Sequence, residues 1–270
     1  MLGFFDSGLG GLTILKEVEK IMPEYSYVYL GDNARAPYGP HGEEMIYNFT
    51  KEGVAELFGR GTELVVLACN TSSAVALKKI QQEFLPKEFP DKRVLGIIIP
   101  TAEEIGNTSS AEEIGVLGTE ATINSKVYEK EIEKHFPELK IHGQSCPLLV
   151  PIIEAGETEW EGLESATKKY LVELFKKSEK VDSIILGCTH YGIIEDLIAK
   201  NIPANVKIIS QGKIIAEKLK NYLSRHPEID GKIEKNGKRI FLTTENSDRI
   251  SKLAGLFLGK AVNFEKTRLD

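Results

Sequence analysis

LVVLACNTSSA (64–74) and SIILGCTHYG (183–192) are the two stretches from which the fold of this chain can be predicted. Each is an apolar run typical of a buried strand, followed by a cysteine and then by hydroxyl or amide residues. A helical pattern follows each of them, at 73–84 and at 193–201. Each cysteine is therefore expected at the carboxyl end of a strand and beside a helix N-terminus, where open α/β sheets bind ligands.

Short apolar runs recur along the chain and alternate with helical patterns. Such runs suit parallel strands buried on both faces, and the alternation predicts an α/β protein. Ten strands are many for one sheet, so we predict two α/β domains, the first at 1–98 plus 207–270 and the second at 99–206. The predicted strands are 2–6, 25–32, 63–69, 93–99, 114–118, 139–144, 182–187, 206–210, 239–244 and 262–265.

Composition and charge exclude several classes of protein. Of 270 residues, 41% are hydrophobic and 27% are charged, which is the composition of globular domains. A net charge of −6 argues against a nucleic-acid-binding surface. No apolar run approaches the length that spans a membrane, and the N-terminus does not resemble a signal peptide. The three cysteines form no disulfide framework, so we expect a reducing, cytoplasmic location.

The turn DSGLGG (6–11) follows the first predicted strand and precedes a predicted helix at 12–22. Thr13 stands where a dinucleotide-binding fingerprint requires its third glycine, so that fingerprint fails. The structural interpretation is a tight turn in which Asp6 or Ser7 caps the helix. The functional alternative places Asp6 beside Cys69, where it orients the thiol or accepts a proton.

GDNARAPYG (31–39) is rich in residues that form turns. It is equally consistent with a polar surface loop and with a loop over a pocket. In the second case the loop would offer Tyr38 and the backbone N–H of Gly39 to a ligand.

Cys69 is open to two interpretations. Free cysteines are usually buried and inert, but the position of Cys69 after a strand favours a functional role. The helix dipole would then favour its thiolate form. Asn70, Thr71 and Ser72 would supply helix caps and hydrogen-bond donors for a carboxylate.

Cys188 and His190 form a Cys-x-His triplet that suits either a catalytic pair or two metal ligands. Zinc requires four ligands and no C-x-x-C spacing is present, so we expect no metal. Cys146 precedes a proline and an apolar run, which predicts packing in the core. Glu154 follows that run, as a partly buried carboxylate near the site or as a solvated residue at a helix end.

Together these motifs resemble those of the glutamate racemase family, the cofactor-independent enzymes of peptidoglycan synthesis. They stand in the family's order over residues 4 to about 191: FFDSGLGGLT, YLGDNARAPYG, LACNTSSA, IGVLGTEATINSKVY, SCPLLVPIIEAG and LGCTHY. The resemblance implies two pseudo-symmetric domains with glutamate held in the cleft between them and no cofactor. It implies Cys69 and Cys188 as the acid/base pair that interconverts L- and D-glutamate, and we expect a homodimer.

The resemblance also assigns further residues to the site. Asp6, His190 and Glu154 are expected to assist the two thiols. The positions expected to contact substrate are Asp6, Ser7, Tyr38, Gly39, Asn70, Thr71, Thr119, Thr122, Thr189 and His190. Two departures from the family pattern are present: Gly192 replaces the usual proline, and Ser210-Gln211-Gly212 replaces Asp-Ser-Gly.

The chemistry explains why two cysteines are needed. Inverting an α-carbon requires a proton to leave one face and another to arrive at the opposite face, and two thiols can do this if one is ionised. Three alternatives stay open. One is a related two-cysteine racemase or isomerase that acts on aspartate, a hydantoin or maleate. The others are a thiol hydrolase that uses Cys188 and His190, and a glutamate-binding protein without activity.

Overall fold

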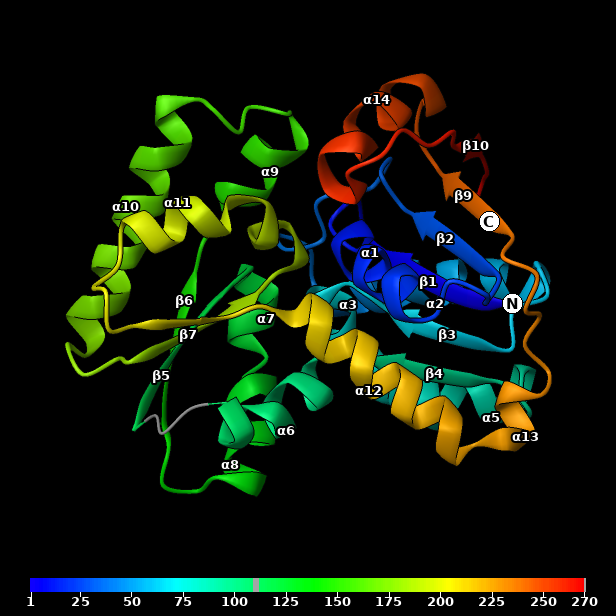
Figure 1. Cartoon of the computed structure of the whole chain (residues 1–270), viewed down its shortest axis with the longest axis horizontal. Coiled ribbons are helices and arrows are strands. Elements are labelled where there is room, and N and C mark those ends of the chain that lie inside the picture. The colour runs from blue at the N-terminus through cyan, green and yellow to red at the C-terminus, as the bar shows by residue number, and fades with distance from the viewer. Residues whose placement is uncertain (109–111, 270) are drawn as a thin grey trace.

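The computed structural model describes residues 1–108 and 112–269 and contains two parallel sheets, seen as two lobes in Figure 1. The six-stranded sheet has the order β10-β9-β2-β1-β3-β4, with bounds β1 Leu2–Asp6, β2 Tyr27–Gly31, β3 Leu64–Leu67, β4 Arg93–Gly96, β9 Arg239–Thr243 and β10 Glu265–Lys266. The four-stranded sheet has the order β6-β5-β7-β8, with bounds β5 Glu113–Gly118, β6 Lys140–Ser145, β7 Ser183–Gly187 and β8 Lys207–Ile209. All paired strands are parallel, so the predicted fold class is confirmed.

The continuous apolar runs are explained by cores on both faces of each sheet. Phe4 and Phe5 are neighbours in β1, and they pack into two different hydrophobic cores. Ile184 and Ile185 of β7 likewise face different cores. Because successive strand residues point to opposite faces, a strand covered on both sides is apolar at nearly every position.

Helices connect the strands and cover the sheets (Figure 1). The chain returns from the second sheet to the first through α12 (Gln211–Arg225), which begins between the two lobes. No helix within the described residues is long and apolar enough to cross a membrane. The remaining α-helices are α1 Leu12–Ile21, α2 Glu43–Gly59, α3 Asn70–Val75, α4 Leu77–Lys79, α5 Leu85–Glu88, α6 Ile98–Thr108, α7 Glu120–Asn124, α8 Val127–His135, α9 Leu149–Glu154, α10 Glu161–Lys177, α11 Glu195–Lys200, α13 Pro227–Asp230 and α14 Ser247–Leu258, with a π-helical turn at Ile80–Phe84 and a 3₁₀ helix at Thr189–Ile194.

The division into domains at 1–98 plus 207–270 and 99–206 stays a prediction. One observation bears on its second boundary: β8, at Lys207–Ile209, pairs with β7 and so belongs to the four-stranded sheet. The last two strands, β9 and β10, join the six-stranded sheet (Figure 1).

Candidate active site

The carboxyl ends of strands from both sheets face one small cavity. Asp6 ends β1, and Cys69 and Cys188 follow β3 and β7. All the residues predicted for the site line this cavity, except Thr122 and Glu154. Its volume is about 20 Å³, which is room for about one water molecule, so the lining residues must separate to admit a larger ligand.

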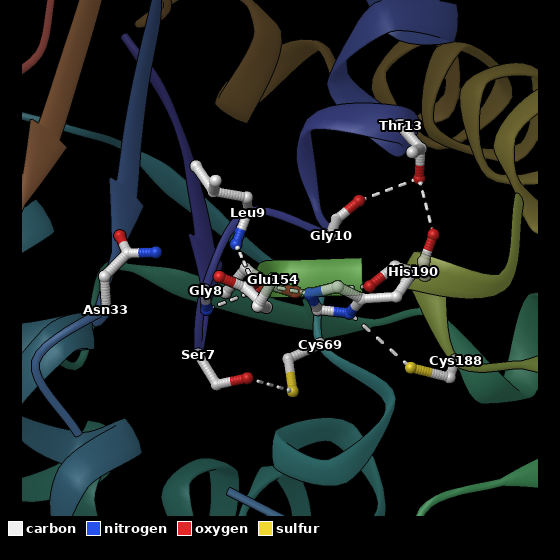
Figure 2. Close-up of polar contacts among 12 residues, drawn as sticks. Ser7, Gly8, Leu9, Gly10, Thr13, Asn33, Cys69, Glu154, Cys188 and His190 are labelled. Atoms are coloured by element: carbon white, nitrogen blue, oxygen red, sulfur yellow. Dashed lines mark hydrogen bonds and ion pairs between the residues drawn. The ribbon is translucent and has the colours of Figure 1, made fainter. Parts of the chain in front are cut away.

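Cys69 is held by hydrogen bonds with two serines. The residue is the N-cap of α3, and its sulfur accepts a hydrogen bond from the N–H of Ser72 at 3.5 Å. The hydroxyl of Ser7 lies 3.4 Å from the same sulfur (Figure 2). The predicted caps Asn70, Thr71 and Ser72 are therefore wrong, because the thiol itself caps the helix.

The charge state of Cys69 also differs from the sequence-based expectation. Burial and the nearby charge of Asp6 raise the pKa of the Cys69 thiol, although hydrogen bonds from Ser7 and Ser72 act in the opposite direction. In the closed cavity these effects favour the thiol over the thiolate, because desolvation outweighs the dipole of the short helix α3.

Cys188 is the end of a chain of three polar side chains. Its sulfur lies 3.6 Å from Nδ1 of His190, and Nε2 of His190 lies 2.6 Å from Oε1 of Glu154. The same Glu154 oxygen accepts a hydrogen bond from the backbone N–H of Leu9 at 2.9 Å (Figure 2). Of the two environments predicted for Glu154, the structure shows the partly buried carboxylate near the site and not the solvated residue at a helix end.

Within these three side chains, the electrostatics favour an ion pair between His190 and Glu154. Burial disfavours the imidazolium form of His190, but hydrogen bonds to Cys188 and Glu154 outweigh it and hold the pKa of His190 well above its usual range. Burial would raise the pKa of Glu154, yet the hydrogen bond from His190 and its charge lower it overall. His190 therefore carries a positive charge beside the sulfur of Cys188 at neutral pH.

Asp6 lies at the base of the cavity and is fully buried. One of its carboxylate oxygens accepts a hydrogen bond from the N–H of Gly8 at 2.7 Å, and the other accepts one from the hydroxyl of Thr189 at 3.4 Å. Burial raises the pKa of Asp6 to about 6, against the opposing effect of the His190 charge. The predicted helix-capping role of Asp6 or Ser7 is wrong, since the N-cap of α1 is Gly11.

Gly8 and Gly10 allow the turn after β1 to touch the other lobe. A Cβ atom at Gly8 would collide with the carboxylate of Glu154, and one at Gly10 would collide with Thr189 and His190. Any larger residue at either position would force these side chains of the site to move. The DSGLGG turn thus serves as a surface of contact between the two halves of the site.

Three threonine hydroxyls form a cluster on the other side of the cavity. Thr71 Oγ1 lies 2.9 Å from that of Thr119 and 3.5 Å from that of Thr122, and the last two are 3.0 Å apart. The backbone of Gly39 packs on Thr119, which brings the 31–39 loop over the pocket as its functional interpretation predicted. Tyr38 also lines the cavity, but its hydroxyl donates to Asp32.

Sequence reasoning missed several features of the site. Pro37 and Val150 line the cavity, and Leu9 contributes a backbone N–H. A backbone donor leaves no signal in the residue type, and apolar lining residues look like any core residue. Cys146 is buried in a hydrophobic core, as predicted. No cluster of three or more potential metal ligands is found in residues 1–108 and 112–269.

Comparison with known proteins gives a consistent result. The profile of the Asp/Glu/hydantoin racemase family matches residues 13–219. A glutamate racemase of Roseobacter denitrificans is 37% identical over 97% of this chain and 98% of its own length. The crystal structure of a glutamate racemase isoform of Bacillus anthracis is similar with a TM-score of 0.89 and 32% identity, covering 100% of this chain and 97% of that one. That of Francisella tularensis, solved in complex with D-glutamate, has a TM-score of 0.86 and 30% identity over 100% and 97%.

Proposed function

The chain belongs to the Asp/Glu/hydantoin racemase family, and from this membership and the geometry of its cavity we propose that it is a glutamate racemase. It interconverts L- and D-glutamate and supplies D-glutamate for peptidoglycan, as its family does. The observation that carries the proposal is the pair of cysteines, Cys69 and Cys188, which reach one cavity from two different sheets.

The two thiols divide the work between the two faces of the α-carbon. Cys69, after it has lost its own proton, removes the proton of D-glutamate while the thiol of Cys188 delivers one to the opposite face. The roles reverse for L-glutamate, which requires Cys188 as the thiolate and Cys69 as the thiol. The imidazolium of His190 stabilises negative charge on Cys188, and Glu154 holds the imidazolium in place. Asp6, with a pKa of about 6, exchanges protons close to neutral pH near Cys69.

Polar groups around the cavity bind the two carboxylates of glutamate. Asn70, Thr71 and Thr189 donate hydrogen bonds to the α-carboxylate, where charge builds up as the α-proton leaves. Such donors lower the barrier because they strengthen as the transition state forms. Ser7, Tyr38, Gly39, Thr119 and Thr122 complete the set of substrate contacts.

The compartment and the assembly follow from the same proposal. Cys69 and Cys188 must stay reduced to exchange protons, and all three cysteines are free, so we propose a cytoplasmic enzyme. The homodimer stays a prediction, which analytical ultracentrifugation tests directly.

The test is a racemisation assay on purified protein without added cofactor. Circular dichroism should report conversion of D- to L-glutamate and of L- to D-glutamate, with the Cys69→Ser and Cys188→Ser proteins as inactive controls. Aspartate, a hydantoin and maleate are assayed beside glutamate. Faster turnover of one of these, a trapped acyl-enzyme at Cys188, or glutamate binding without exchange of the α-proton would each contradict the proposal.

A further inference from the structure

Gln211 lies at the junction of the two lobes, as the first residue of α12. It stands at one of the two departures from the family pattern and is 4% exposed. Its Oε1 accepts a hydrogen bond from Nδ2 of Asn70 at 2.6 Å. Its Nε2 lies 3.0 Å from both Thr101 Oγ1 and Tyr128 Oη, and 3.3 Å from Asn70 Oδ1. One side chain thus joins residues of α3, α6 and α8.

The direction of each hydrogen bond in this cluster is fixed by its neighbours. The hydroxyl of Thr101 donates to the carbonyl of Ile97 at 2.7 Å, so its oxygen can accept from Gln211. The hydroxyl of Tyr128 donates to Oδ1 of Asn70 at 2.7 Å, so it too accepts from Gln211. Oδ1 of Asn70 is then the accepting side of the amide and Nδ2 the donating side.

The arrangement leaves one N–H of Asn70 available. Nδ2 has two hydrogens, and its hydrogen bond to Gln211 uses one of them, with no second partner among residues 1–108 and 112–269. Asn70 is one of the residues that line the cavity, between Cys69 and Thr71. Reversing the Asn70 amide would break its hydrogen bonds with both Gln211 and Tyr128. The Asn70 oxygen would then face the Gln211 oxygen, and the Asn70 N–H groups would face the donating hydroxyl of Tyr128.

We propose that Gln211 is a positioning residue, which orients the Asn70 amide so that its second N–H meets the α-carboxylate of the substrate. The inference rests on the proposed function, since it names Asn70 as a donor to glutamate. Gln211 does not line the small cavity between the two cysteines, although it does line a neighbouring cavity of about 390 Å³ that reaches Cys188 and Thr189. In this proposal it acts on the α-carboxylate through Asn70. Its effect on catalysis therefore requires Asn70 to be present.

Gln211→Met keeps the length and the burial of the side chain but removes both of its hydrogen-bonding groups. We expect kcat/KM to fall about 10- to 100-fold in both directions, with a rise in KM as well as a fall in kcat, because a misplaced donor weakens binding and stabilises the transition state less. Asn70→Ala alone should cause a loss at least as large. The double variant should be no worse than Asn70→Ala within about twofold, since both changes remove one interaction.

Gln144→Met is the matched control, because Gln144 is a 5% exposed glutamine that binds Ser145 and Glu173 away from the cavity. Its kcat/KM should equal that of the unmodified protein. If Gln211→Met does not fold, Gln211→Ser is tested in the same cycle, because its side chain is too short to keep the pair with Asn70.

The outcomes separate the two proposals. An unmodified protein that does not racemise glutamate contradicts the proposed function. An active unmodified protein with an unaffected Gln211 variant overturns the positioning role alone. Losses that multiply in the double variant overturn it too, because they would mean that Gln211 and Asn70 act independently.

Discussion

Oε1 of Glu154 lies 2.6 Å from Nε2 of His190, and this ion pair keeps a positive charge beside the sulfur of Cys188. Glu154 and His190 both belong to the lobe with the four-stranded sheet. Leu9, whose N–H also donates a hydrogen bond to Glu154, belongs to the lobe with the six-stranded sheet. The charge state of one half of the site therefore depends on contact with the other half.

Glu154→Gln should shift the pH profile of the enzyme. Without the carboxylate the pKa of His190 falls, so the imidazolium is lost at lower pH and the alkaline limb of the kcat profile moves to lower pH. At pH 8 we expect a loss in kcat of about 10- to 100-fold. The measurement is kcat against pH in both directions. Glu164→Gln, an exposed carboxylate on α10, is the control, and an alkaline limb that stays in place would contradict the role of Glu154.

Replacing either cysteine should separate the two half-reactions. Cys69→Ser and Cys188→Ser should each lose racemisation almost completely, because serine is too weak an acid to supply the ionised base. With a glutamate analogue that carries a β-leaving group, Cys69→Ser should still eliminate from the L form and Cys188→Ser from the D form. If both variants eliminated from the same enantiomer of the analogue, the two thiols could not act on opposite faces of the α-carbon.

Deuterium should enter the product from solvent in both directions. The proton that returns to the α-carbon comes from the second thiol, which exchanges with water between turnovers. Mass spectrometry of product formed in D₂O should show one deuterium at the α-carbon. Transfer of the original proton with retention would instead indicate a single base that moves across the substrate.

Asp6→Asn should change how stability depends on pH. The pKa of Asp6 is about 6 in the folded protein, above its ordinary value of 3.8, so the folded state binds more protons between these pH values and loses stability as pH rises through them. The asparagine variant lacks this loss. Its free energy of unfolding relative to the unmodified protein should rise by on the order of 3 kcal/mol from pH 4 to pH 7. Urea unfolding at several pH values measures the difference, and parallel curves would refute the assignment.

Asp6→Asn and His190→Asn should both lower kcat more than they raise KM. Each side chain is assigned to proton transfer, so removing it affects the transition state more than the bound substrate. Steady-state kinetics in both directions tests this. A rise in KM with unchanged kcat would move the residue to the substrate-binding group.

Activity should survive dialysis against a chelator when a thiol reductant is present. The expectation rests on the missing zinc spacing around Cys188 and His190 and on the chemistry of two thiols. Loss of activity that zinc alone restores would revive the metal interpretation of this pair.

The fold was largely predictable because apolar runs report burial on both faces of a strand. The runs around Phe4 and Ile184 led to the right sheets, since every position of such a strand contacts a core. The helix after β3 was less predictable. Its sequence reads as one helix over 73–84, whereas the structure divides it and inserts a π-helical turn at Ile80–Phe84.

The site could be predicted where the type of side chain determines the chemistry. It could not be predicted where a role depends only on the position of a residue in the folded structure. Cys69 and Cys188 stand out because each follows a strand and precedes a helix, which is where open α/β sheets bind ligands. The capping of α3 by Cys69 was not predictable, because sulfur is an uncommon cap and the choice depends on backbone geometry. Gln211 could be noticed only as a departure from a family pattern, since its partners are far away in the sequence.

The close approach of Gly8 and Gly10 to the other lobe has a kinetic consequence. The cavity of about 20 Å³ is too small for glutamate, so we expect the two lobes to move apart when substrate enters. Such motions displace solvent, and their rates fall as the solvent becomes more viscous. Substrate capture should therefore slow in glycerol or sucrose, even though the chemistry of the enclosed thiols is shielded from the bulk liquid.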